Sequence, residues 1–248
     1  MDSQDCVKLE RICDVIQDVQ GAKYCLQLLI EDHESSQRIW RLNWLEAQLG
    51  YLETKPEITF EMMLQNRPAP SLIERRRLAL TLAYSLFQLH ESPWLSQNWD
   101  KDRMHFFYNS AGVLDLHRPY LSTSFEEFPS GGEPPDLNRF HRNLGILRLG
   151  ILLIEVHKWK PLECFRIEDD LKDGIPTPNT DMEVARRVLE ALDDCFPTYR
   201  GAIEACLRVP WVSGGSRVSL GDSETWNGVY SNVIEPLERE VALGTAVL

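Results

Sequence analysis

The sequence predicts an α+β domain that is mostly helical, and three observations carry this prediction. Alternation of apolar and polar residues, typical of strands, is confined to the early part of the chain and one short stretch near its middle. Several longer segments repeat apolar residues at helical spacing. One of them, residues 143–159, is apolar on nearly every side, as expected of a helix at the centre of a domain. The 248 residues, 43% of them hydrophobic, suffice for a packed core.

The first predicted element is an amphipathic helix over residues 7–20, ended by Gly21. Its apolar residues recur at helical spacing: Leu9, Ile12, Cys13, Ile16 and Val19. Next, YCLQLLIE and QRIWRLNW frame the polar turn DHESS, and the second segment alternates apolar and polar residues from Trp40 to Trp44. This pattern predicts a β-hairpin with one buried face.

Two helix starts follow, each with a recognisable cap. Thr59 is the predicted N-cap of the segment ITFEMMLQ. The prolines of NRPAPSLIE then break the chain, and Ser71 and Glu74 have the spacing of a capping box. The helix that they start carries one apolar stripe, formed by Leu78, Leu82, Leu86 and Leu89.

The middle of the chain predicts a second hairpin, a long loop and the buried helix. MHFFY, the turn NSAG and VLDL predict the hairpin, and residues 121–142 predict the loop. The buried helix contains Gly145 and Gly150, which lower helix propensity, so we expect a neighbouring element to pack closely there.

The last part of the chain predicts three more helices. Thr180 and Glu183 have the spacing of a capping box for a helix that Pro197 ends, and residues 199–208 form the next one. We expect the last helix to be kinked at Pro236. Its predicted apolar positions are Trp226, Tyr230, Val233, Leu237 and Val241.

Composition narrows the classes of function. The net charge of -12 and the pI of about 5.0 disfavour nucleic-acid binding. The longest basic run, Arg75 to Arg77, predicts a solvated or ion-paired helix face. No two of the six cysteines are spaced as C-x-x-C, the start MDSQDCVKLE is polar, and no apolar stretch is long enough to span a bilayer. We therefore expect a reduced, cytoplasmic protein with no membrane span.

The order of these elements resembles the C-lobe of protein kinases. In that fold a helix ending in Leu-His precedes the catalytic loop, a hairpin and a loop follow, and a buried helix bears Leu-Gly-x-x-x-x-Glu. This chain has LALTLAYSLFQLH, then ESPWLSQNW, then the hairpin and loop, and LGILLIE at 149–155. The resemblance implies a kinase-like fold with a reduced N-terminal lobe at 1–68 and a helical C-lobe at 69–248.

The residues that phosphoryl transfer requires are missing from the catalytic-loop position. Laying H-R-D-x-x-x-x-N on the sequence puts Ser96, Gln97 and Asn98 at H-R-D. Arg103 falls at the metal-binding Asn. Asn98 is not basic enough to take a proton, and Arg103 would repel Mg²⁺.

The D-F-G position is equally altered. It falls on Arg118, Pro119 and Tyr120, whereas a shifted alignment offers Asp115 as a single carboxylate. No G-x-G-x-x-G occurs, and the histidines form no metal-binding pattern. We therefore expect no catalytic residues, no cofactor and no metal site. The alternative is residual nucleotide binding with Asp115 as the one metal carboxylate.

A closer resemblance covers nearly the whole chain. The sequence is similar to a fungal kinase-like domain of unknown function that often follows helical prion-inhibition-and-propagation (HeLo-type) domains. The matching pieces recur in order: RLALTLAYSLFQLHESPWL, RPYLS, LGILRLGILLIEVHKWKPLE, DLKDGIP, YRGAIEACL and VYSNVIEPLE. This resemblance implies a degenerate kinase-like fold and, by association, a role in self/non-self recognition or regulated cell death.

Two hypotheses of function follow. The first is a non-catalytic interaction and signalling module that binds a protein partner or a neighbouring helical domain. The second is a nucleotide-binding pseudokinase switch with little or no phosphoryl transfer. Exposed aromatic residues outside the cleft would favour the first, and an open cleft beside Asp115 would favour the second.

Overall fold

A computed structural model describes residues 54–89, 100–122, 141–212, 219 and 221–246, and the backbone of five short strands between residues 7 and 46. The chain forms two compact units, which divide between Leu52 and Glu53. The kinase-like division at 68/69 stays a prediction. None of the described helices is both long enough and apolar enough to cross a membrane.

The described part of the first unit consists of antiparallel strands. β1 (Val7–Leu9), β4 (Ser36–Arg41) and β3 (Leu28–His33) pair in that order, and β2 (Tyr24–Cys25) pairs with β5 (Leu45–Glu46). The register of β3 and β4, from Leu28 opposite Arg41 to His33 opposite Ser36, confirms the predicted hairpin.

The prediction of a helix over residues 7–20 is wrong at its start. Val7 to Leu9 form a strand, with Val7 opposite Arg41 and Leu9 opposite Ile39. These three residues alternate apolar and polar, a pattern that also suits a β-strand. Pairing with the backbone of β4 therefore outweighs their preference for a helix. The remainder of the predicted helix, 10–20, lies outside the described residues.

Both predicted helix caps at the start of the second unit are confirmed. The Thr59 hydroxyl accepts the Met62 N–H at 3.2 Å and starts α2 (Phe60–Asn66). Glu74 Oε2 accepts the Ser71 N–H at 2.9 Å, and the Ser71 hydroxyl accepts the Glu74 N–H at 3.3 Å. This capping box starts α3 (Leu72–Leu89).

A three-stranded antiparallel sheet lies next to these helices in the sequence. Its order is β6 (Ile58–Thr59), β7 (Met104–Phe106) and β8 (Tyr120–Leu121). The predicted NSAG turn is present, since Tyr108 bridges to Leu114 and the Asn109 N–H donates to the Val113 carbonyl at 2.8 Å. However, β7 pairs with Tyr120–Leu121 instead of with VLDL, since Met104 lies opposite Leu121 and His105 opposite Tyr120.

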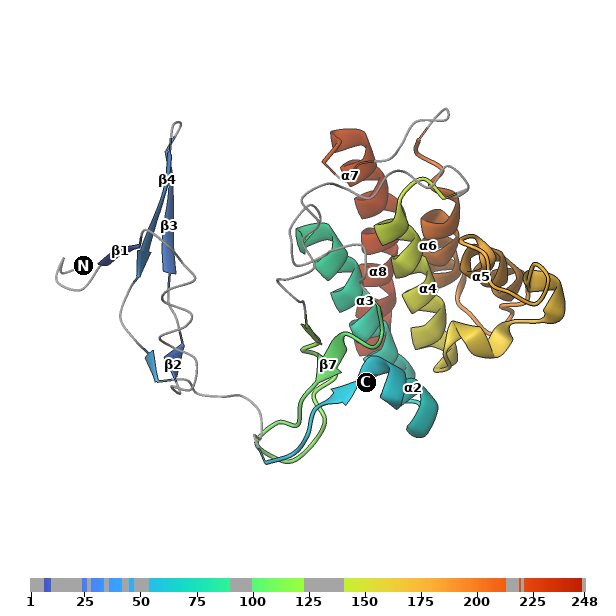
Figure 1. Cartoon of the computed structure of the whole chain (residues 1–248), viewed down its shortest axis with the longest axis horizontal. Helices are drawn as coiled ribbons and strands as arrows, with labels where there is room; N and C mark the ends of the chain where they lie inside the picture. Colours follow the sequence, from blue (N-terminus) through green and yellow to red (C-terminus); the bar gives the residue numbers. More distant parts are fainter. Residues whose placement is uncertain are drawn as a thin grey trace. The chain divides into compact units, whose positions relative to one another are not determined.

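The predicted buried helix is α4 (Leu144–Lys158), at the centre of the helical layer. Figure 1 shows α4 among the helices of this unit: it packs against α3, α5 (Thr180–Glu190) and α6 (Pro197–Arg208). The last helix, α8 (Glu235–Ala246), packs against α3 and α6. The Asn143 side chain caps α4 by accepting the Ile146 N–H at 2.9 Å.

Close packing at both glycines of α4 is confirmed. A Cβ on Gly150 would lie 2.8 Å from Cys206 Cβ on α6, and one on Gly145 would lie 3.2 Å from the Leu86 side chain on α3. Larger residues at these positions would force the two neighbouring helices away from α4.

Two predictions about the last helices need correction. Thr180 begins α5, but its hydroxyl donates to the Asp170 carbonyl and accepts the Thr177 N–H, so the predicted capping box with Glu183 is absent. Pro197 begins α6 instead of ending α5, because proline suits the first turn of a helix, where no N–H partner is needed.

The last predicted helix is continuous but consists of two α-helices joined by a π-helical turn. α7 (Ser223–Val229) passes into a π-helical turn (η5, Tyr230–Ile234) and then into α8. Pro236 has no N–H to donate and its ring crowds the preceding turn, which accounts for the widened turn just before it. Short 3₁₀ helices, η3 (Leu162–Phe165) and η4 (Glu168–Asp170), follow α4.

Candidate functional site

The predicted site residues fall into three groups. Ser96, Gln97 and Asn98 lie outside the described residues. Arg103 directly precedes β7, where its carbonyl accepts the Ser122 N–H at 2.9 Å. Arg118, Pro119 and Tyr120 lead into β8.

Asp115 is engaged within its own turn. Its Oδ1 accepts the His117 N–H at 2.9 Å, its Oδ2 lies 3.8 Å from Arg118 Nε, and its N–H donates to the Phe107 carbonyl at 2.9 Å. The structure thus brings Asp115 and Arg118 together beyond the end of β7, whereas Arg103 stands before its start. Across the described ranges, no three His, Cys, Asp or Glu side chains gather in a way that could hold a metal ion.

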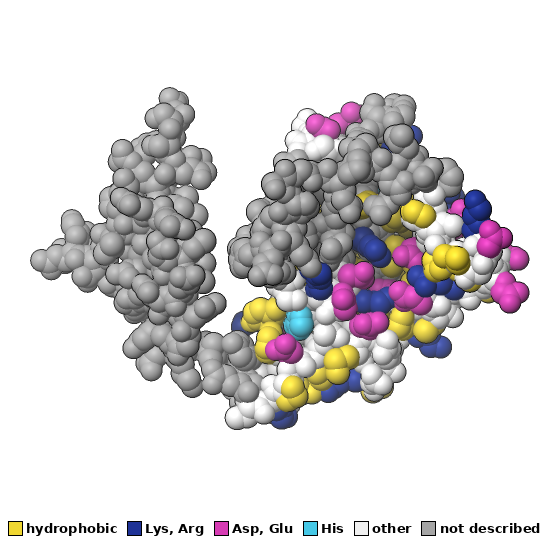
Figure 2. Space-filling model, in the orientation of Figure 1, with side chains coloured by type: hydrophobic (Ala, Val, Ile, Leu, Met, Phe, Trp, Pro, Cys, Tyr) yellow, Lys and Arg dark blue, Asp and Glu magenta, His cyan; other side chains and the backbone are white. Residues whose placement is uncertain are grey.

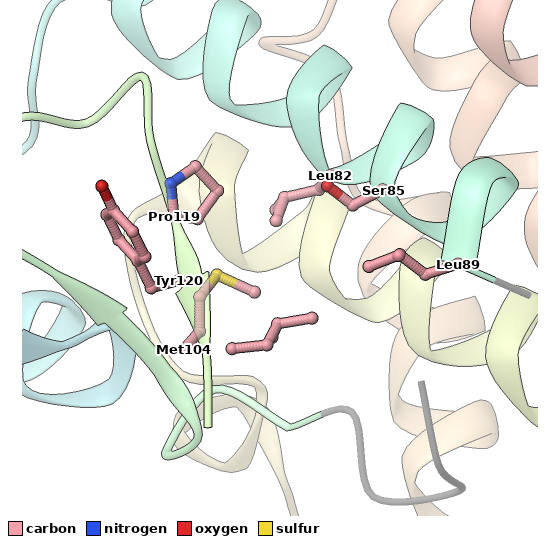
Figure 3. A pocket seen from close by; sticks show the side chains of 7 residues that line it. Leu82, Ser85, Leu89, Met104, Pro119 and Tyr120 are labelled. Atoms are coloured by element: carbon pink, nitrogen blue, oxygen red, sulfur yellow. The ribbon is translucent and has the colours of Figure 1, made fainter. Parts of the chain in front are cut away.

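A pocket of about 350 Å³ lies between α3 and the ends of β7 and β8. Figure 3 shows its lining, which consists of Leu82, Ser85, Leu89, Met104, Pro119, Tyr120 and Leu121. No charged side chain is among these residues, and the Ser85 hydroxyl donates to the Thr81 carbonyl at 2.8 Å. Two residues of the predicted D-F-G position therefore line an apolar pocket, and Arg118 and Asp115 do not.

A buried ion-pair cluster lies within the predicted catalytic-loop segment, because Lys101 falls between the positions of Asn98 and Arg103. Lys101 Nζ lies 2.8 Å from Glu155 Oε1 and 2.6 Å from Glu163 Oε2, and Glu155 also accepts the Leu162 N–H at 2.8 Å. Burial acts to lower the pKa of Lys101, but the two carboxylates outweigh it and raise that pKa above its usual value. The cluster fixes the chain before β7 to α4 and η3.

Lys101 was not identified from the sequence, although the sequence could have indicated that Glu155 needs a partner. Glu155 stands in a helix predicted to be buried, and a buried carboxylate needs a cation or hydrogen-bond donors. The sequence could indicate that need, but the spacing of 54 residues between Glu155 and Lys101 gave no local pattern to identify the cation.

A second buried cluster surrounds Arg76. Its guanidinium carbon lies 3.6 Å from the centroid of the Tyr199 ring, its Nε lies 3.5 Å from Glu240 Oε2, and its Nη atoms lie 3.2 and 3.3 Å from His157 Nδ1. Burial lowers the pKa of His157, so the neutral ring accepts from Arg76 and donates from Nε2 to Asp194 at 3.3 Å. The predicted ion-paired face is thus partly confirmed, but at Arg76 it is buried instead of solvated.

Charges on the surface near residue 100 are also paired. Arg148 lies 3.8 Å from Asp100 and 3.6 Å from Asp181, and Arg166 lies 2.7 Å from Asp181. Figure 2 shows acidic and basic side chains interleaved on one face of this unit. Because these neighbouring charges neutralise each other, the described side chains here do not form a patch of one charge that would attract an ionic ligand.

Exposed aromatic rings lie outside the pocket. The rings of Phe87 on α3 and Trp226 on α7 have centroids 4.0 Å apart, and Trp226 and Tyr230 are nearly parallel, at 9°, with centroids 6.3 Å apart. Trp226 is 41% exposed and Tyr230 38% exposed. Tyr84 donates a hydrogen bond to Glu238, which raises the pKa of Tyr84 to about 12.

The first two apolar positions of the predicted last helix, Trp226 and Tyr230, are thus exposed, whereas Val233 and Leu237 further along it are buried. The buried positions of α7 are Thr225, Gly228 and Val229, because α7 packs through Gly228 against the ring of Trp211. This contact rotates Trp226 toward solvent, and the π-helical turn shifts the helical phase before the apolar stripe resumes in α8.

The comparison with known protein families confirms that the chain is a domain of unknown function, and it does not test the kinase-like or fungal part of the resemblance. Residues 2–244 match the model of a family described as a domain of unknown function, DUF7580, and the chain belongs to that family. Among curated proteins, none matches the chain significantly.

Proposed function

We propose that this chain is a non-catalytic, kinase-like module for protein interaction and signalling. The order of α3, the β7–β8 strands, the buried α4 and the helices α5 to α8 supports the kinase-like part of the proposal. It is the order that the sequence motifs predict, with LGILLIE on the central helix. The resemblance to fungal domains adds the proposed setting, which is self/non-self recognition or regulated cell death.

The observation that carries the non-catalytic part is the state of Asp115 and of the pocket. Phosphoryl transfer needs carboxylates that hold Mg²⁺ and cations that hold phosphates. Asp115 accepts a hydrogen bond within its own turn and faces Arg118, and the described residues that line the pocket carry no charged side chain. These features supply neither the metal site nor the phosphate site.

The observation that favours interaction is the exposure of Trp226 and Tyr230 outside the pocket. Tryptophan and tyrosine are the side chains most often found at the energetic centres of protein interfaces. Both are held by packing against Phe87, so a partner would meet a rigid surface and lose little conformational entropy from this side.

A second candidate function is a nucleotide-binding switch without transfer. The specific observation in its favour is the pocket itself, which Tyr120 helps to line and which, at about 350 Å³, is large enough for a flat ring system. In this candidate the base would bind among apolar side chains, and Asp115 would have to leave its turn to meet a metal ion.

Thermal unfolding of the purified chain with and without ATP and Mg²⁺ tests the proposal. A ligand that binds only the folded state stabilises it by about 2.7 kcal/mol at a hundredfold excess over its Kd. We expect no upward shift in Tm and no transfer of labelled phosphate. A shift that disappears in Asp115→Ala but persists in the matched variant Asp169→Asn would contradict the proposal and support the switch.

A further inference from the structure

One surface has the chemistry of a binding site for a cationic segment of a protein. We call it the aromatic face and define it by Tyr84, Phe87, Trp226 and Tyr230. It joins α3 to α7 and the π-helical turn. The two exposed rings, Trp226 and Tyr230, are nearly parallel and lie against the ring of Phe87.

The molecule shows elsewhere how its aromatic rings are used. Arg76 lies over Tyr199, and Lys55 and Arg67 both lie over the ring of Tyr108, with Lys55 Nζ 4.6 Å from the centroid. Within the described part of the chain, no Lys or Arg lies over Trp226 or Tyr230. Tryptophan has the strongest attraction for cations of the aromatic side chains.

Three carboxylates stand at the start of α7 and on α8, the helices that carry or follow these two rings. Asp222 lies one turn before Trp226, whose backbone N–H donates to the Asp222 carbonyl at 2.9 Å. Glu235 follows Tyr230 across the π-helical turn, and Glu238 accepts the hydrogen bond from Tyr84. Among the described residues of these elements, Arg239 pairs with one of the three carboxylates, since it lies 2.6 Å from Glu235. These described side chains therefore sum to a negative charge, and the net charge of the whole chain is also negative.

We propose that the aromatic face binds an arginine-bearing, cationic segment of a partner protein. An arginine guanidinium would lie over Trp226 or Tyr230, and further cations would meet Asp222 and Glu238. Arginine is favoured over lysine because its planar, weakly hydrated head stacks on a ring and forms forked hydrogen bonds with carboxylates. The inference rests on the proposed function and adds the surface and the chemistry of the partner.

A labelled peptide of four Arg-Ser-Leu repeats tests this inference by fluorescence anisotropy on the whole chain. The comparison peptides replace every Arg by Lys or by Glu. We expect binding in the order Arg, Lys, Glu, with little binding of the last. Trp226→Ala should weaken binding of the Arg peptide about tenfold, which corresponds to the loss of one cation–π contact.

Three further variants separate the face from general effects. Trp226→Leu keeps an apolar contact with Phe87 but removes the aromatic ring, so it should lose binding as Trp226→Ala does even if the alanine variant folds poorly. Phe196→Ala removes an aromatic residue that is 56% exposed elsewhere and should bind normally. Asp222→Asn should weaken binding more than Asp169→Asn, although both change the net charge equally.

Equal binding of the Arg peptide by the wild type and Trp226→Leu would overturn the inference. Equal effects of Asp222→Asn and Asp169→Asn would overturn it as well, since binding would then follow net charge alone. Neither result touches the proposed absence of nucleotide binding, which the ATP experiment measures separately.

Discussion

The two sides of α3 differ in chemistry. One side presents Leu82, Ser85 and Leu89 to a pocket whose described lining has no charged side chain. Another presents Tyr84 and Phe87 to exposed rings and carboxylates of α7 and α8. The predicted resemblance to kinases concerns the first side, whereas the exposed aromatic rings lie on the second.

This difference teaches that a fold and a site are separate properties of a sequence. The residues that keep the helical layer together, such as Gly150 on α4, are in place. Near the pocket, by contrast, Asp115 already accepts a hydrogen bond from the His117 N–H and faces Arg118. The order of helices that motivates the proposed resemblance to kinases therefore does not by itself predict a nucleotide site.

The largest expected effect comes from loosening α3 itself, on which both sides depend. Arg76→Leu leaves Glu240 buried without its cation and removes the contact with Tyr199. Breaking one partner of a buried ion pair costs about 3–5 kcal/mol. Urea denaturation should show a loss of this size, with little change for Arg77→Ala. A loss below about 1 kcal/mol would mean that Arg76 does not anchor α3.

An intermediate effect on stability and peptide binding is expected from a substitution that displaces α7, which carries Trp226 of the aromatic face. In Gly228→Ala the new methyl group would lie 2.2 Å from the ring of Trp211, so α7 must shift. Overpacking of this kind costs about 1–3 kcal/mol. We expect lower stability and weaker binding of the Arg peptide. Gly201→Ala is the control, because a Cβ there meets nothing within 4 Å. Equal losses in both variants would contradict the proposed packing of α7.

The smallest expected effect is a change with pH at Tyr84. The hydrogen bond to Glu238 raises the pKa of Tyr84 to about 12, above its usual value of 10.0. The folded state therefore holds this proton longer than the unfolded state, and the stabilisation is complete below pH 10 and lost as the pH rises through about 12. Tyr84→Phe should cost about 1 kcal/mol at neutral pH.

That difference in free energy of unfolding between the wild type and Tyr84→Phe should shrink between pH 10 and pH 12. Comparing the two proteins at each pH removes the contribution of lysines, which titrate in the same range. A constant difference across this interval would mean that Tyr84 is not held by Glu238.

The sequence predicted local features of the fold more reliably than tertiary ones. The caps at Thr59 and Ser71 depend on a few neighbouring residues, and the structure confirms them. At Gly150 the sequence indicated a close approach but did not identify the neighbour, which is Cys206 on α6. The strand at Val7 to Leu9 depends on a partner strand about thirty residues away, so its helical spacing was misleading.

The candidate site was predictable in part for the same reason. Motif spacing located Asp115 and Arg118, and the structure brings these two together. The outward position of Trp226 depends on Gly228 packing against Trp211, a contact that no periodic pattern encodes. A surface that depends on such a tertiary contact can be identified only from the three-dimensional structure.

One titration series tests most directly whether binding belongs to the aromatic face and not to the pocket. NMR can follow the methyl group of Met104 in the pocket and the indole N–H of Trp226 while the Arg peptide and then ATP with Mg²⁺ are added to the same protein. We predict that the peptide shifts the Trp226 signal and leaves Met104 unchanged, and that ATP shifts neither. A shift of Met104 with ATP, together with a Trp226 signal indifferent to the peptide, would contradict both the proposed function and the assigned surface.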